Sequence, residues 1–191
     1  MSYKDKGVQK EAQRKHYLKN KSLFIERTKE KRKINKLYVE QYKEAHACTC
    51  GESCVACLQL HHLGDKDTSV ANAMQRFGLK RLKKEIDKCE VMCANCHRKI
   101  HRNDHPATTE NAKRLRNRAF VIEYKKTHCC EECGETEELL LDFHHDGEKE
   151  IDISRAVCDW GLPNLKKEIA KCKVLCANCH RKIHYHWAVR K

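Results

Sequence analysis

The nine-residue segment CANCHRKIH occurs twice, at Cys93–His101 and at Cys176–His184, and it combines two kinds of metal ligand. Each copy contains a Cys-x-x-Cys pair, whose thiolates suit Zn²⁺, and then a His-x-x-x-His pair. If the segment is helical, this second spacing brings both imidazoles to one helix face. Each copy therefore offers half of a structural metal site and part of a second, separate metal site.

Thiolate partners for these cysteines lie upstream. Cys130-x-x-Cys133 and Cys176-x-x-Cys179 together make a four-thiolate set that can close a tetrahedral Zn²⁺ site. For Cys93 and Cys96, the alignment of the two copies favours Cys48 and Cys50, although their Cys-x-Cys spacing is one residue short. Cys54 and Cys57 have the better spacing, so a set that includes Cys54 is the alternative. We expect two structural Zn²⁺ ions per chain, held by Cys48, Cys50, Cys93 and Cys96 and by Cys130, Cys133, Cys176 and Cys179.

The cysteine pattern belongs to a long internal duplication. Residues 50–101 align with residues 133–184 at a constant offset of 83, and GLKRLKKEIDKCEVMCANCHRKIH matches its counterpart at 19 of 24 positions. Upstream the offset is 82, so the basic segment before each copy is duplicated too. Two copies of one fold predict a monomer that acts as a pseudo-dimer.

Short elements must position these ligands. Residues 139–145 are apolar and suit a strand before a DG turn, and 162–172 have helical Leu and Ile spacing with Pro163 in the first turn. A short strand at 173–176 and a final helix complete each copy. We therefore expect an α+β protein with two tandem zinc-stapled units, each preceded by a basic helix.

Four segments follow from these patterns. Residues 1–46 form a basic helical arm with 14 Lys and Arg against 6 Asp and Glu, read as one long helix or two with a bend. The first unit covers 47–101, a linker and basic helix cover 102–127, and the second unit covers 128–191.

Composition narrows the classes of function. The net charge of +13 favours a polyanionic partner, most simply nucleic acid. With 6% aromatic residues, one large core is not expected, and metal ions would stabilise small domains. Fourteen cysteines without a recognisable secretory signal favour metal binding over disulfides. No segment is apolar enough to suggest a membrane span, so we expect a cytoplasmic protein.

A second set of histidines recurs in both copies. His61-His62 accompanies His97 and His101, and His144-His145 accompanies His180 and His184. Adjacent residues on a strand point to opposite sides, so one imidazole can bind a cation while its neighbour takes another role. Because the pKa of histidine is near neutrality, that role can be general base catalysis.

These motifs resemble the HNH endonucleases, whose fold is called ββα-metal. The resemblance rests on CEECG (130–134), LLLDFHH (139–145), IAKCKVLCANCHRKIH (169–184) and their first-copy counterparts. It implies that His62 and His145 are general bases, and that a catalytic divalent cation such as Mg²⁺ or Mn²⁺ is held by His61, His97 and His101 and by His144, His180 and His184. The family's middle Asn is not clearly present, because Lys171 or Cys172 occupies its approximate place. That departure leaves the orientation of the base open.

The implied reaction is hydrolysis of phosphodiester bonds in double-stranded DNA, leaving 5′-phosphate and 3′-hydroxyl ends. Candidate phosphate contacts are Arg98, Lys99, Arg181 and Lys182. Because both copies keep all four histidines, we expect both strands to be cut, as in a homing or restriction enzyme of a bacterial or phage-infected cell. A nickase with one active unit, or a non-catalytic zinc-stapled DNA-binding protein, is the alternative.

Overall fold

The computed structural model describes residues 6–101 and 111–189. The protein is α+β, mostly helical with two small antiparallel sheets. Its contacts divide the chain into two compact units, Met1–Tyr42 with His62–Glu90, and Lys43–His61 with Val91–Lys191. The first repeat, predicted at 47–101, thus contributes to both units. Most of the predicted linker, residues 102–110, lies outside the described residues.

The basic arm adopts the two-helix form, with α1 at Lys6–Lys19 and α2 at Lys21–Glu44. In the first compact unit α2 is joined to two short helices, α3 at Val70–Arg76 and α4 at Leu79–Ile86. The buried side chain of Asn35 donates to the carbonyls of Met74 and Phe77, both at 2.9 Å. Carbonyl groups at a helix C-terminus have no hydrogen-bond partner within their own helix. Asn35 supplies hydrogen bonds to two of them at the end of α3, and these bonds also connect α2 to α3.

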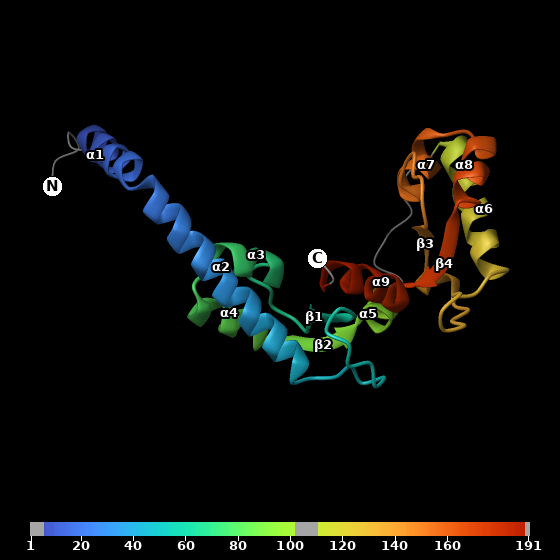
Figure 1. Ribbon diagram of the computed structural model, residues 1–191, viewed down its shortest axis with the longest axis horizontal. Coiled ribbons are helices and arrows are strands. Elements are labelled where there is room, and N and C mark those ends of the chain that lie inside the picture. Colours follow the sequence, from blue (N-terminus) through green and yellow to red (C-terminus); the bar gives the residue numbers. More distant parts are fainter. Residues whose placement is uncertain (1–5, 102–110, 190–191) are drawn as a thin grey trace. The chain divides into compact units, whose positions relative to one another are not determined.

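The second compact unit repeats this arrangement. Helix α6 at Ala112–Lys126 packs against α7 at Ile153–Asp159 and α8 at Leu162–Ile169 (Figure 1). Buried Asn117 donates to the carbonyls of Val157 and Trp160, at 3.1 and 2.9 Å. Under α6 lies a core cluster made of Ile153, Ala156, Leu165 and Ile169.

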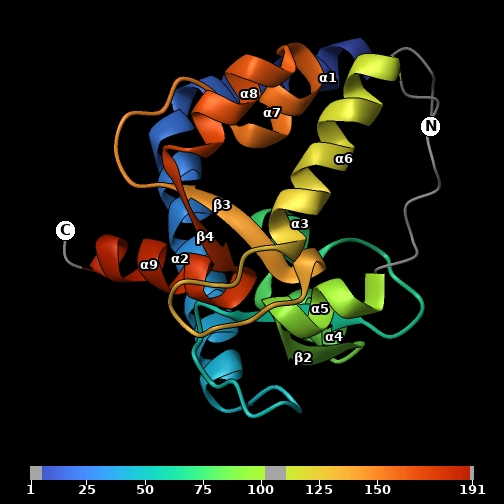
Figure 2. The same ribbon diagram turned by 90° about the vertical axis from the view of Figure 1, so that its right-hand side faces the viewer.

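Each repeat contains one two-stranded sheet. Strand β1 at Leu58–His62 pairs with β2 at Cys89–Cys93. Strand β3 at Leu141–His145 pairs antiparallel with β4 at Cys172–Cys176, as Figure 2 shows. A 3₁₀ turn, η3 at Glu138–Leu140, leads into β3. The second strand of each sheet runs directly into the helix that carries the His-x-x-x-His pair, α5 at Ala94–Ile100 or α9 at Ala177–Val189. Strand and helix together therefore fix the histidines relative to one another.

Helices α5 and α9 contact each other within the second compact unit. The backbone N–H of Asn95 donates to Oδ1 of Asn178, and the N–H of Asn178 donates to Oδ1 of Asn95, both at 3.2 Å. These residues are 83 apart, the offset between the repeats. The contact is thus reciprocal, like an isologous dimer interface within one chain.

Along residues 6–101 and 111–189, no helix is both long enough and apolar enough to cross a membrane.

Candidate metal centres

The structure brings the eight predicted cysteines together in two groups of four. One group is Cys48, Cys50, Cys93 and Cys96, and the other is Cys130, Cys133, Cys176 and Cys179. Within each group, every sulfur lies within 4.8 Å of the others. Both groups could hold Zn²⁺, since four thiolates are a standard structural zinc set.

Sulfur geometry in the two groups suits a tetrahedral ion. The Sγ atoms of Cys50 and Cys93 are 3.6 Å apart, and those of Cys133 and Cys176 are 3.7 Å apart. Zn–S bonds of about 2.3 Å at tetrahedral angles place two sulfurs roughly 3.8 Å apart. Both measured separations therefore match what one zinc ion requires.

Backbone amides at helix starts and turns favour a thiolate at one cysteine of each group. The Sγ atoms of Cys93 and Cys176 accept the backbone N–H groups of Cys96 and Cys179, each at 3.4 Å, at the start of α5 and α9. Burial opposes ionisation of Cys48, but backbone hydrogen bonds outweigh it and lower the pKa of Cys48 to about 6. The same balance lowers the pKa of Cys130 to about 7. Burial and the neighbouring sulfurs raise the pKa values of Cys96 and Cys179 instead. Because the thiolate is the form that binds zinc, a bound ion would have to displace the protons of these thiols.

Cys54 belongs to a different cluster, with Glu52 and Cys57. Burial raises the pKa of Cys57 to about 12, and its thiol donates to the carbonyl oxygen of Asn178 at 3.4 Å. Glu52 already pairs with Lys182, at 2.7 Å. The structure groups Cys48 and Cys50, and not Cys54, with Cys93 and Cys96, so the geometry favours Cys48 and Cys50 over the alternative that includes Cys54.

The predicted cation ligands also come together, as two groups of three histidines. His61, His97 and His101 form one, and His144, His180 and His184 form the other. In the first group, Nδ1 of His61 lies 3.0 Å from Nε2 of His97 and 3.3 Å from Nε2 of His101. In the second, the Nε2 atoms of His180 and His184 are 3.2 Å apart. Nitrogens bound to one ion at about 2.1 Å are roughly 3.0–3.4 Å apart, so both groups fit a single cation.

The chemistry of a three-histidine group differs from that of a four-cysteine group. Four thiolates close a tetrahedral ion, whereas three imidazoles leave positions for water or substrate, as in catalytic sites. Burial and the neighbouring imidazoles lower the pKa values of His97 and His144. The neutral imidazole required for binding a cation is thereby favoured.

The second histidine of each pair contacts a buried glutamate. Nε2 of His145 lies 2.9 Å from Oε1 of Glu168, and Nε2 of His62 lies 2.9 Å from Oε1 of Glu85. Glu168 is itself held by Lys171 at 2.7 Å and by the backbone N–H of Glu150 at 3.0 Å. The hydrogen bond from Lys171 is the largest of the effects that lower the pKa of Glu168 to about 2. An ionised carboxylate on Nε2 leaves Nδ1 of the same ring free to accept a proton.

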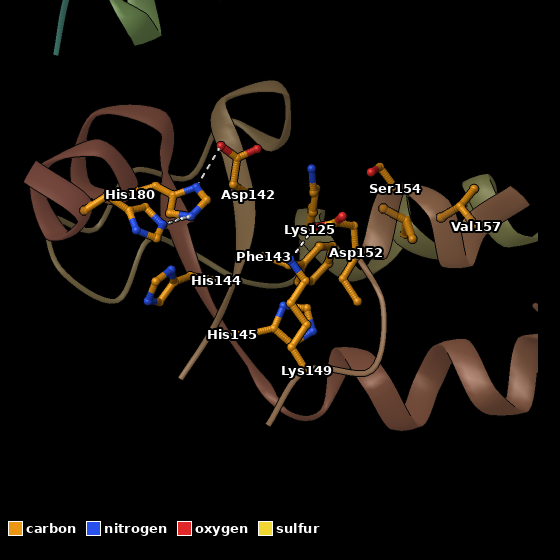
Figure 3. Close-up of a pocket in the computed structure, with 13 residues that line it drawn as sticks. Lys125, Asp142, Phe143, His144, His145, Lys149, Asp152, Ser154, Val157 and His180 are labelled. Carbon is orange, nitrogen blue, oxygen red and sulfur yellow. Dashed lines mark hydrogen bonds and ion pairs between the residues drawn. The ribbon is translucent and has the colours of Figure 1, made fainter. Parts of the chain in front are cut away.

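One cavity of about 610 Å³ in the second compact unit joins these features. It is lined by the cation ligands His144, His180 and His184 and also by His145 (Figure 3). Strand alternation predicts that His144 and His145 point apart, yet both imidazoles reach this cavity at the end of β3. Lys125 and Lys149 also line it, the first donating to the carbonyl oxygen of Leu141 and the second paired with Asp152. The cavity therefore combines a cation group, an oriented imidazole and cationic side chains.

The four predicted phosphate contacts form contacts within the protein instead. Arg98 binds both carboxylate oxygens of Asp142, at 3.0 and 2.7 Å. Lys99 pairs with Glu137 at 2.8 Å, Lys182 with Glu52, and the guanidinium of Arg181 faces Gln59. All of these contacts join the two repeats within the second compact unit. Their role in this structure is to connect the repeats.

Sequence reasoning missed Glu85, Glu168 and Asp142. Both glutamates lie in the repeated segment LKKEI, where they read as part of a charged helix surface. Their burial, at 3% and 1% exposure, comes from tertiary contacts that the helical pattern does not reveal. The available signal was the identity of the segment in both copies. Asp142 had no such signal, because its counterpart in the first repeat is Gln59.

Comparison with protein-family models, with curated proteins and with solved structures finds no match to this chain.

Proposed function

We propose that this protein is a divalent-cation-dependent endonuclease of the HNH type, which hydrolyses phosphodiester bonds of double-stranded DNA. The observation that carries the proposal is the cavity of the second repeat, where a three-histidine cation group and an imidazole held by Glu168 line one surface. A protein that only binds DNA through zinc-stapled folds needs neither feature. As part of the same proposal, we interpret the two strands and the following helix of each repeat as a ββα-metal unit.

The three histidines supply the binding group for the cation. When bound by His144, His180 and His184, the cation would polarise the scissile phosphate and stabilise the leaving 3′-oxygen. Mg²⁺, Mn²⁺ and similar ions provide this chemistry, and imidazole ligands favour the transition metals among them.

His145 acts as the general base. Glu168 accepts the proton on Nε2, which fixes the ring and leaves the Nδ1 lone pair for the attacking water. As the water oxygen bonds to phosphorus, its proton passes to Nδ1 and the bond from phosphorus to the 3′-oxygen breaks. The 3′-oxygen takes a proton from solvent, so the products carry 5′-phosphate and 3′-hydroxyl ends. His62 and Glu85 provide the same pair in the first repeat.

Positive charge supports DNA as the substrate. The chain carries a net charge of +13, and the helices that precede the two repeats, α2 and α6, are rich in lysine and arginine. Such charge binds the phosphate backbone without reading its sequence. A phosphate that enters the cavity would meet Lys125 and Lys149, and would compete with the Leu141 carbonyl and with Asp152 for their ammonium groups.

The direct test is cleavage of supercoiled plasmid and of a random DNA library by the zinc-loaded chain. We expect cleavage with Mg²⁺, Mn²⁺ or Ni²⁺, none with EDTA, and 5′-phosphate ends on the sequenced products. His128→Ala should cleave DNA like the wild-type chain. His128 stacks on Tyr124, with ring centroids 3.9 Å apart, and does not line the cavity. Binding without cleavage under every metal and DNA would overturn the proposal and favour a zinc-stapled DNA-binding protein.

A further inference from the structure

In each three-histidine group, one histidine has a ring nitrogen, Nδ1, that contacts a side chain from a strand of the second repeat or of the first. In the second repeat this residue is Asp142, whose Oδ2 lies 3.4 Å from Nδ1 of His180 (Figure 3). Arg98, from the helix of the first repeat, binds the same carboxylate through two hydrogen bonds, at 3.0 and 2.7 Å. A chain of contacts therefore runs from one repeat through Asp142 to the cation group of the other.

The first repeat has the equivalent arrangement, but its strand residue is a glutamine instead of an aspartate. Gln59, 83 residues before Asp142, lies 2.6 Å from Nδ1 of His97 and faces Arg181, the counterpart of Arg98. The Gln59 amide satisfies both neighbours when its oxygen accepts from Arg181, at 2.7 Å from Nη1, and its nitrogen donates to His97. An amide thus replaces a carboxylate at the equivalent position.

The two residues favour different tautomers of the histidine that each contacts. Nε2 of His97 and Nε2 of His180 face the other members of their groups, so a cation bound there requires a proton on Nδ1. Asp142 has two oxygens and can accept from Nδ1 and from Arg98 together. Gln59 has one oxygen, which Arg181 engages, so its amide N–H meets Nδ1 of His97 and favours the proton on Nε2 instead.

We propose that the two cation groups are unequal, and that His144, His180 and His184 bind a divalent transition-metal ion more tightly than His61, His97 and His101. Asp142 and Gln59 are positioning residues that set the difference, and each is held by an arginine of the other repeat. This inference rests on the cation binding in the proposed function, and it adds the order in which the two histidine groups bind their cations. At limiting cation the second repeat is occupied first, and one strand is cut before the other.

Calorimetric titration of the zinc-loaded chain with Ni²⁺, in the absence of DNA, tests this order. We expect two binding events whose dissociation constants differ by at least about 10-fold, the usual effect of changing a residue that holds a metal-bound histidine. His144→Ala should abolish the tighter event and His61→Ala the weaker one. Zinc content measured afterwards shows that the cysteine groups kept their ions. Two equal events, a tight event that survives His144→Ala, or no Ni²⁺ binding would each overturn the inference.

Two nearly isosteric substitutions separate positioning from folding. Asp142→Asn should weaken the tighter event about 10- to 100-fold, and Gln59→Glu should strengthen the weaker one. A merely structural role for Gln59 cannot produce that gain. Asp159→Asn, in α7 and outside both groups, is the matched control and should change neither constant. Unchanged constants in both test variants would contradict the assignment of Asp142 and Gln59.

The readout distinguishes this inference from the proposed function. Equal Ni²⁺ affinities in a chain that cuts DNA would overturn the inequality and leave the nuclease proposal standing. Unequal Ni²⁺ affinities in a chain that cuts no DNA would overturn the nuclease proposal and leave the inequality of the two cation groups standing.

Discussion

Oε1 of Glu168 lies 2.9 Å from Nε2 of His145, and the two side chains are only 1% and 10% exposed. The first repeat has the same relationship between Glu85 and His62. The resemblance to HNH endonucleases left the orientation of the proposed base open, because Lys171 or Cys172 stands near the place of the middle Asn of those enzymes. In this protein Glu168 holds the imidazole, and Lys171 holds Glu168. In the proposed reaction, a carboxylate in this position would also stabilise the imidazolium that forms when His145 takes a proton.

Glu168→Gln is therefore expected to slow cleavage by the second repeat. The amide keeps the shape of the side chain, but it no longer stabilises the imidazolium and can favour the wrong tautomer. We expect a loss of about 10²- to 10⁴-fold in that repeat's cleavage rate, with unchanged DNA affinity, measured in a His62→Ala background. Glu123→Gln, on the exposed side of α6, is the control. Equal rates for these two variants would show that Glu168 does not position the base.

Zinc removal from the second repeat should destabilise that part of the chain. Cys176→Ala takes one ligand from its group, so we expect zinc content to fall from two ions per chain to one, together with a lower melting temperature. In small zinc domains the metal contributes on the order of 10 kcal/mol to folding. Cys158→Ala removes a thiol that lies outside both groups and should leave the zinc content at two. Two zinc ions in the Cys176→Ala variant would contradict the assignment.

The ligand set of the first zinc group can be tested by comparing two serine variants. Cys48→Ser removes a sulfur from the group that contains Cys93, whereas Cys54→Ser removes one from the cluster with Glu52 and Cys57. We expect elemental analysis to give one zinc per chain for Cys48→Ser and two for Cys54→Ser. The opposite pattern would establish the alternative ligand set.

The reciprocal contact between Asn95 and Asn178 should contribute to stability. Asn178→Ala removes the acceptor for the backbone N–H of Asn95, and a donor left without its partner in a half-buried contact costs about 1 kcal/mol or more. We expect chemical denaturation to show a free energy of unfolding lower by that amount. Asn164, exposed on α8, provides the comparison as Asn164→Ala. If both variants unfold alike, the contact is incidental.

Local pattern and the internal repeat predicted much of the fold. The helical spacing of Leu162, Leu165 and Ile169 matches α8, although the predicted helix continued to Cys172, which begins β4. The apolar run before the DG turn contains β3. Alignment of the copies predicted Cys48 and Cys50 as zinc-site partners of Cys93, although the Cys-x-Cys spacing is irregular. The structure groups these residues. Helices α3 and α7 were not predicted, because seven residues are too few to show a helical period.

Long-range partners could not be predicted from local pattern. Arg98 and Lys99 read as free cations on a helix, because Asp142 and Glu137 lie about 40 residues further along the chain. Glu168 accepts the backbone N–H of Glu150, which lies 18 residues earlier in the chain and reaches it only in the folded protein. The exchange of Asp142 for Gln59 was visible in the sequence, but its meaning depends on the histidine that each residue contacts.

In the proposed function, His62 and His145 activate water in the two repeats. The most direct test of this role compares plasmid cleavage by the wild-type chain, by His62→Ala, by His145→Ala and by the double variant, with saturating divalent cation. We predict that the wild type linearises the plasmid, that each single variant only nicks it, and that the double variant leaves it supercoiled. Cleavage by the double variant at the wild-type rate would contradict the account.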